Sequence, residues 1–160
     1  MPTHSEKRFL PYSPEQIFDL VVDIERYPEF LPWCVGARIR SRQDNEIVAD
    51  LMIGIKMMRE RYTSRVTYQR PGRKPGRIDV TYERGGPFKH LTNRWILTAV
   101  KGGCEIDFFL DFEFRSRILQ RLIGLLFQEA VHRMVGAFES RAKRMYGAQP
   151  LAKPTLAPNP

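Results

Sequence analysis

The side chains that could perform acid–base or metal chemistry are few in this chain and lie far apart. Its three histidines, His4, His90 and His132, fall in separate segments, and none has a partner at the spacing of metal ligands. The chain also has no G-x-S-x-G nucleophile motif, no P-loop, and no G-x-G-x-x-G sequence after an expected strand. These features predict neither a metal site nor a catalytic centre.

The acidic residues offer no better candidate for a catalytic pair. Asp107, Asp111 and Glu113 alternate with apolar residues along one segment, which places them on the outer face of an expected strand. A general acid or base needs a sheltered environment that shifts its pKa. We therefore expect these carboxylates to form solvent-exposed ion pairs with nearby lysines or arginines.

The basic residues indicate a kind of partner rather than a reaction. The net charge of +8 favours binding to anionic membranes, nucleic acid or acidic proteins. Four cations crowd one expected turn, namely Arg70, Arg73, Lys74 and Arg77. This cluster is suited to lipid headgroups or RNA phosphates, and a solvated turn explains it equally well because no aromatic residue lies among the cations. DNA is not an expected partner.

The cysteines and the apolar segments bear on the cellular compartment. Cys34 and Cys104 are far apart and outside any C-x-x-C spacing, and the first residues form no apolar leader-like segment. The longest strongly apolar stretch, Ile118 to Phe127, falls far short of the roughly 20 residues of a membrane span. We expect reduced thiols and a cytoplasmic protein that is peripheral to the inner membrane.

The first part of the chain predicts a strand, a short helix and an apolar turn. The strand is expected from His4 to Leu10, and Ser13-Pro14-Glu15-Gln16 has the pattern of a helix start with a capping box. The segment Tyr27–Cys34 then places aromatic residues between prolines, a pattern that prevents regular structure but requires burial. A rigid apolar loop or a short helical turn is expected there.

A period of two residues dominates the middle of the chain, from Ala37 to Arg115. Turns are expected at Pro71–Gly76, Gly85–Pro87 and Gly102–Gly103, and the segments between them alternate apolar with polar residues. Connections of hairpin length predict an antiparallel sheet of six or seven strands.

A helical period returns after Ser116 and continues to about Tyr146, which corresponds to a helix of roughly 45 Å. The first part of this helix is apolar over much more than the ~100° stripe of an ordinary surface helix. We therefore expect the sheet to enclose the helix on most of its circumference, in an α+β fold with a cavity between helix and sheet. One domain is expected over residues 1–147, followed by a disordered tail rich in proline and alanine over residues 148–160.

Three ordered blocks of sequence carry a family resemblance that extends over nearly the whole chain. The first block is Val22–Cys34, and the second is Gly86–Leu91 followed by Trp95. The third combines Phe108–Phe114 with Met134–Glu139, Arg141-Ala142 and Tyr146-Gly147. These blocks resemble the coenzyme Q-binding START-like proteins of the polyketide cyclase/START superfamily. The resemblance implies the helix-grip fold, a curved antiparallel sheet wrapped around a long C-terminal helix.

The resemblance also implies a function. It implies that the protein binds ubiquinone, or a similar isoprenoid lipid, as a non-catalytic carrier or chaperone that supports respiratory electron transfer. It also implies that the protein has no cofactor besides the bound quinone and that an anionic membrane surface is a partner. A sister branch, the ribosome association toxins, implies instead a regulator that binds the large ribosomal subunit and blocks subunit joining. Trp33 favours the quinone branch. An aromatic polyketide cyclase, which shares the fold, is a third alternative.

The expected ligand-binding residues are apolar and come from the proline-rich loop, the sheet and the long helix. The mouth of the cavity is expected at Phe30–Trp33, with basic residues nearby that hold the protein to anionic lipid. The predicted set is Phe30, Leu31, Trp33, Leu51, Ile53, Trp95, Phe108, Leu110, Phe112, Leu119, Ile123, Phe127, Met134 and Phe138.

Overall fold

The computed structural model describes residues 3–55 and 57–147, without the side chains of residues 55, 58, 123 and 126. The predicted tail over residues 148–160 lies outside the described residues. In chain order the elements are β1 (Thr3–Leu10), α1 (Pro14–Val22), the 3₁₀-helix η1 (Ile24–Glu29), β2 (Cys34–Gln43), β3 (Glu46–Ile55), β4 (Met58–Gln69), β5 (Gly76–Gly85), β6 (Phe88–Val100), β7 (Gly103–Phe114) and α2 (Arg117–Tyr146).

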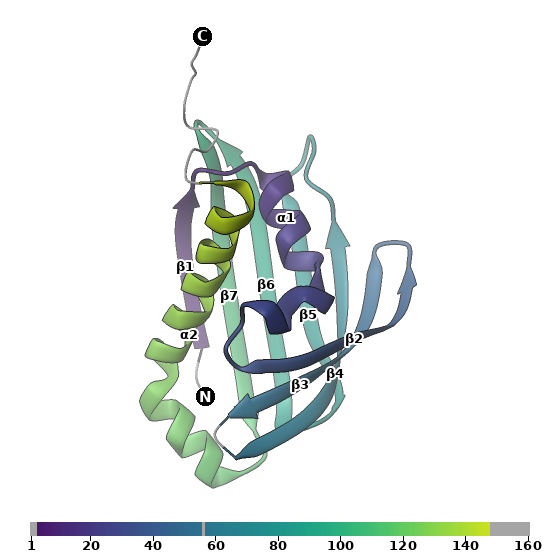
Figure 1. Cartoon of the computed structure of the whole chain (residues 1–160), viewed down its shortest axis with the longest axis vertical. Coiled ribbons are helices and arrows are strands. Elements are labelled where there is room, and N and C mark those ends of the chain that lie inside the picture. The colour runs from purple at the N-terminus through teal and green to yellow at the C-terminus, as the bar shows by residue number, and fades with distance from the viewer. Residues whose placement is uncertain (1–2, 56, 148–160) are drawn as a thin grey trace.

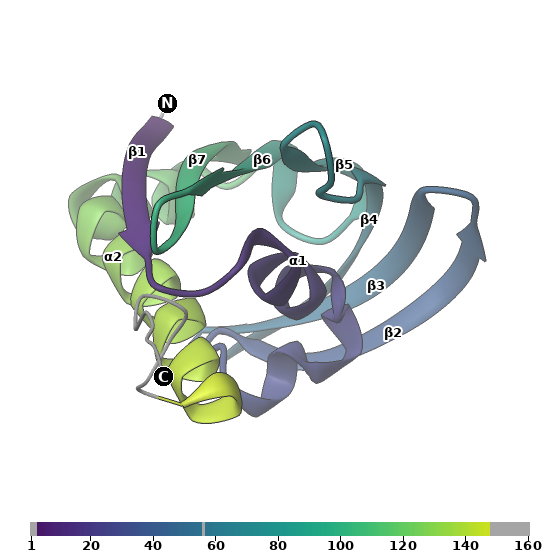
Figure 2. The same ribbon diagram turned by 90° about the horizontal axis from the view of Figure 1, so that it is seen from above.

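The strands form one antiparallel sheet of seven strands in the order β1-β7-β6-β5-β4-β3-β2. Consecutive strands from β2 to β7 are neighbours, as their short connections predict, and β1 adds to the free edge of β7. The sheet curves around α1, and α2 lies across the open side of the curve (Figures 1 and 2). The α+β class and the curved antiparallel sheet with a long C-terminal helix are confirmed.

The start of α1 is fixed by its predicted capping box. The Ser13 hydroxyl accepts a hydrogen bond from the Gln16 backbone N–H at 3.1 Å, and the Gln16 side chain accepts one from the Ser13 N–H at 2.9 Å. Pro14 stands at the first helical position, where no backbone N–H is needed. The apolar face that follows, including Ile17 and Phe18, is buried against the concave face of the sheet.

The proline-rich segment after α1 forms the 3₁₀-helix η1 and a short loop, in agreement with the predicted helical turn or loop. The Tyr27 hydroxyl donates a hydrogen bond back to the carbonyl of Val21. Leu31 is buried, and Trp33 is half-buried just before β2. This segment therefore folds against α1 and forms the wall opposite the sheet.

From Phe127 onward, α2 packs on the molecule through apolar and polar contacts. Its buried residues are Phe127, Val131, Val135, Phe138 and Ala142. On β1, Glu6 accepts hydrogen bonds from His4 at 2.7 Å and from Arg8 at 3.1 Å, and Arg8 reaches Glu139 of α2 at 2.7 Å. This polar network lies on the inward side of β1 and ties the strand to the helix.

The first part of α2 is not enclosed, so the expectation of burial on most of its circumference is wrong there. Ile118 is 81% exposed, Leu125 is 80% exposed and Leu122 is 39% exposed. The physical reason is length, because the 30 residues of α2 extend for roughly 45 Å and the eight residues of β1 for roughly 27 Å. The helix begins beyond the end of the strand that it crosses (Figure 1).

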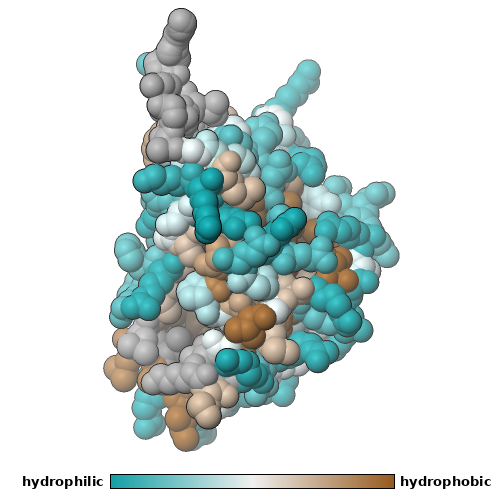
Figure 3. Space-filling model, in the orientation of Figure 1, coloured by the Kyte–Doolittle hydropathy of each residue, from teal (hydrophilic) through white to brown (hydrophobic). Residues whose placement is uncertain are grey.

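The exposed apolar residues give the lower end of the molecule a mixed surface. Brown side chains gather there in Figure 3, and Figure 1 places both the start of α2 and the turn between β3 and β4 at that end. Met57, in that turn, is 97% exposed. No helix in the described part of the chain has the length and apolarity needed to cross a membrane.

Candidate functional site

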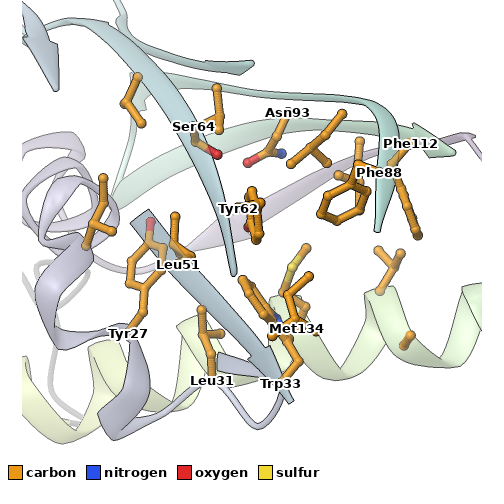
Figure 4. A pocket seen from close by; sticks show the side chains of 18 of the residues that line it. Tyr27, Leu31, Trp33, Leu51, Tyr62, Ser64, Phe88, Asn93, Phe112 and Met134 are labelled. Atoms are coloured by element: carbon orange, nitrogen blue, oxygen red, sulfur yellow. The ribbon is translucent and has the colours of Figure 1, made fainter. Parts of the chain in front are cut away.

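A cavity of about 200 Å³ lies between the concave face of the sheet, the α1–η1 segment and the middle of α2 (Figure 4). It is partly open to the surface and its walls are mainly apolar. The residues that line it are Val21, Ile24, Tyr27, Leu31, Trp33, Leu51, Ile53, Tyr62, Ser64, Val66, Ile78, Val80, Phe88, Leu91, Asn93, Trp95, Leu110, Phe112, Phe114, Phe127, Ala130, Val131, Met134 and Phe138.

Most of the predicted ligand-binding residues line this cavity. They come together from the loop after η1, from the three strands β3, β6 and β7, and from α2, which are far apart in the sequence. These residues are Leu31, Trp33, Leu51, Ile53, Trp95, Leu110, Phe112, Phe127, Met134 and Phe138.

Three predicted residues lie elsewhere. Phe30 packs its ring against Tyr27 and Phe138, with ring centroids 5.9 and 5.2 Å apart. Phe108 contacts the Trp95 ring edge-on at 4.9 Å and lines a second, much smaller pocket. Leu119 is half-buried against the core without reaching the cavity. The side chain of a fourth, Ile123, lies outside the described residues.

The most exposed residue that lines the cavity, Ala130, belongs to α2. The half-buried lining residues are Tyr27, Trp33, Val80, Leu91, Asn93 and Met134. Figure 4 shows Trp33 and Met134 on the same side of the cavity, next to α2. Of the predicted mouth residues Phe30–Trp33, Leu31 and Trp33 line the cavity and Phe30 does not.

Sequence reasoning missed the polar residues that line the cavity. Tyr62 and Ser64 of β4 and Asn93 of β6 stand among apolar neighbours on the concave face. The alternation of side chains along a strand could have placed Ser64 and Asn93 on the inward face of the sheet. Ser64 lies between inward-facing Tyr62 and Val66, and Asn93 falls two residues before buried Trp95.

The ionisable groups at the cavity are neutral at physiological pH. Burial raises the pKa of the Tyr27 and Tyr62 hydroxyls well above their ordinary value. Burial also raises the pKa of the Cys34 thiol to about 11 and that of Cys104 to about 12. Both cysteines are buried and free, as expected, so they are poor nucleophiles.

Of the three carboxylates on the outer face of β7, Glu113 has the predicted kind of partner and lies 3.6 Å from Lys89. Asp111 lies 3.2 Å from the Nε2 atom of His90 rather than beside a lysine or arginine, and Asp107 has no ion pair among the described residues. In the described part of the chain, no group of three or more His, Cys, Asp or Glu residues is arranged to hold a metal ion.

The predicted basic cluster occupies the turn between β4 and β5. Arg70 pairs with Asp19 at 3.4 Å, and Arg77 pairs with Asp79 at 2.6 Å. Arg73 and Lys74 are exposed. Figure 1 places this turn at the upper end of the molecule, away from the start of α2.

The fold and the cavity define a small α+β protein with an apolar cavity between its sheet and its long helix. The chain belongs to the polyketide cyclase / dehydrase and lipid transport family, whose sequence profile matches residues 10–139. A START superfamily protein of known structure from Mycobacterium smegmatis has a TM-score of 0.72 at 19% identity, covering 89% of this chain and 98% of that one, and so shares the fold. The expected START-like fold is thus confirmed.

Two relatives carry different functional names. The ribosome association toxin RatA of Rickettsia prowazekii (strain Madrid E) is 41% identical over 145 residues, which cover 91% of this chain and 99% of that protein. The coenzyme Q-binding protein COQ10 homolog B, mitochondrial, of Xenopus laevis is 34% identical over 155 residues, which cover 93% of this chain and 62% of that protein. The family resemblance seen in the sequence is confirmed for both branches.

Proposed function

We propose that this protein binds ubiquinone or a similar isoprenoid quinone as a non-catalytic carrier or chaperone that supports respiratory electron transfer. The apolar cavity between α2 and the sheet is the observation that carries this proposal. The relative named as a coenzyme Q-binding protein supports it.

A binding role suits the chemistry of the cavity walls. In the described part of the chain, the lining residues include no carboxylate, histidine or lysine, and the tyrosine hydroxyls are held protonated by burial. General acid–base catalysis at neutral pH needs a group that titrates near that pH. This composition favours a carrier over a cyclase.

A carrier of this kind has to approach a membrane. Each buried CH₂ group of a polyprenyl tail is worth roughly 0.8 kcal/mol relative to water, so the tail does not leave a bilayer through the aqueous phase. Transfer from the bilayer into an apolar cavity is nearly neutral by the same measure. The protein therefore acts by receiving the quinone at the membrane surface, in a peripheral position.

The exposed stripe of α2 is the surface that we assign to this contact. Ile118, Leu122 and Leu125 recur at helical spacing and are exposed, and Arg117 and Arg121 are exposed on the same turns. Apolar residues flanked by arginines are typical of helices that lie in the interface of an anionic bilayer. The predicted attachment through the β4–β5 turn fits less well, because that turn lies at the other end of the molecule.

Transfer from vesicles tests the proposal. Protein incubated with anionic vesicles that contain ubiquinone, and then separated from them, should retain quinone. Protein that binds these vesicles and is recovered without quinone would contradict the carrier function. Protein that takes up quinone from detergent micelles, and binds no vesicles, would contradict the membrane contact alone.

Ribosome binding is the second candidate function. It is favoured by the 41% identity to a protein named as a ribosome association toxin and by the net charge of +8. Co-sedimentation with the large ribosomal subunit at moderate salt would support it. An unchanged profile of ribosomal subunits when the protein is overproduced would argue against it.

A further inference from the structure

Three polar side chains face the otherwise mainly apolar cavity from the concave face of the sheet. Tyr62 and Ser64 belong to β4 and Asn93 to β6, with β5 between them. Val80 of β5 pairs with Val66 on one side and with Asn93 on the other, so Ser64 lies two residues along β4 from the row of Asn93. Figure 4 shows Ser64, Asn93 and Tyr62 grouped on the side of the cavity formed by the sheet.

Ser64 carries a buried hydroxyl that no residue in the described part of the chain pairs with in good hydrogen-bond geometry. Its side chain is 1% exposed, and in the described part of the chain its Oγ has no hydrogen-bond partner. A buried polar group without a partner destabilises a fold, and native proteins have few of them. A hydroxyl left unpaired at the wall of a cavity indicates a ligand atom that pairs with it.

Two hydrogen bonds hold the Asn93 amide in place and leave it one free N–H group and one free lone pair. Its Nδ2 donates to the Phe109 carbonyl at 2.8 Å, and its Oδ1 accepts from the Trp95 indole N–H at 3.0 Å. A primary amide has two N–H groups and two lone pairs, so one of each remains. The two existing bonds fix the orientation of the amide before a ligand arrives.

Tyr62 provides a third donor. It is 5% exposed, and its hydroxyl is a close neighbour of the Ser64 hydroxyl. Burial raises its pKa, so the hydroxyl keeps its proton. Together with Ser64 and Asn93 it offers O–H and N–H donors inside an otherwise apolar wall.

We propose that Tyr62, Ser64 and Asn93 form a polar subsite that receives a carbonyl-bearing ring, the head of the quinone, by donating hydrogen bonds to its oxygen. This inference rests on the proposed function and adds the orientation of the ligand and the chemistry that selects it. The oxygen of a quinone only accepts, which matches three side chains that all donate.

The size of the cavity supports the same orientation. An apolar protein cavity of roughly 150 Å³ holds a benzene molecule. The 200 Å³ found here therefore has room for one substituted ring and excludes most of a polyprenyl tail. The ring occupies the polar end, and the tail leaves through the opening beside Trp33 and Met134.

Calorimetric titration with two probes tests the subsite in the full chain. One probe is a short-chain ubiquinone with a single isoprene unit, and the other is a prenylated alkylbenzene, which has a ring and a tail without a carbonyl. The test variants are Ser64→Ala and Tyr62→Phe. The matched control is Thr67→Ala, which removes an exposed hydroxyl from the same strand.

Each test variant should bind the quinone about 3- to 10-fold more weakly, in keeping with the loss of one hydrogen bond, and should bind the hydrocarbon as the native protein does. Ser64→Ala should melt no lower than the native protein, because it removes an unsatisfied group. Equal quinone affinity in all proteins, or equal losses for both probes, would overturn the subsite and leave the carrier function standing. A native protein that binds neither probe would overturn both.

Discussion

Arg141 of α2 connects the helix to the turn that closes the cavity. Its Nη2 donates to Glu29 Oε1 at 2.8 Å, and its guanidinium carbon lies 5.1 Å from the centre of the Phe30 ring. Phe30 in turn packs against Phe138 of α2. These contacts hold η1 and the Trp33 loop against α2 on the side where the cavity opens.

Removing the contacts of Arg141 with Glu29 and Phe30 should speed ligand exchange. In Arg141→Ala the cation–π contact, worth about 0.5–1 kcal/mol, is lost, so release of bound quinone should be about 2- to 5-fold faster. Stopped-flow transfer to acceptor vesicles measures the rate. Arg133→Ala removes an arginine that pairs with Glu129 on the exposed side of the same helix, and should leave the rate unchanged. Identical rates in both variants would contradict a gating role.

The exposed stripe of α2 should govern membrane binding. Replacing Ile118 and Leu125 together by serine removes two exposed apolar side chains, each worth about 1.5 kcal/mol or more when fully buried, so binding to anionic vesicles should fall at least tenfold. Vesicle flotation measures it. Val100→Ser, a 40%-exposed valine at the other end of the molecule, is the control. Undiminished flotation of the double variant would place the membrane contact elsewhere.

The Glu6 network should make the docking of α2 sensitive to acid. Burial tends to raise the pKa of Glu6, but the hydrogen bond from His4 and the charge of Arg8 outweigh it, and the pKa lies below its ordinary value of 4.5. The stability that Glu6 contributes is therefore complete above about pH 4.5 and is lost as the pH falls through the lowered pKa.

Glu6→Gln should unfold more easily than the native protein by about 1 kcal/mol at pH 7, and the difference should shrink at pH 3.5. Urea unfolding at the two pH values measures it. Glu60→Gln, on an exposed position of β4, should show no such change. A constant difference between the native protein and Glu6→Gln at both pH values would exclude this linkage.

Filling the cavity should abolish ligand binding and preserve the fold. Val80 lies in the middle of the concave face, and Val80→Phe places a ring in the empty space. Because the space is free, the overpacking penalty should stay near the lower end of the usual 1–3 kcal/mol. Quinone uptake should fall at least tenfold, and Val80→Ala, which enlarges the cavity, should retain it. A filled variant that still takes up quinone would locate the ligand elsewhere.

The alternating and helical patterns were sufficient to predict the sheet, the long helix and most of the cavity wall. The inward face of β7, for example, reads Phe108, Leu110, Phe112 in the sequence. Sequence could not tell that the Trp95 ring lies against Phe108, which then lines the smaller pocket. That outcome depends on side-chain packing across strands, which a period of two does not contain.

Two other features also depend on tertiary structure. The exposure of Ile118 and Leu125 follows from the length of α2 relative to β1, and no local pattern states that relation. The register of β4, β5 and β6 places Ser64 and Asn93 on the same wall of the cavity. Their polarity was visible in the sequence, and their shared location was not.

Organic extraction of the purified protein, followed by mass spectrometry, tests the central claim most directly. Protein produced in a host that makes ubiquinone should yield ubiquinone or a closely related isoprenoid quinone, and Val80→Phe purified in the same way should yield little. An extract without any isoprenoid, together with no uptake of added quinone by the native protein, would contradict the assignment of the cavity as a quinone site.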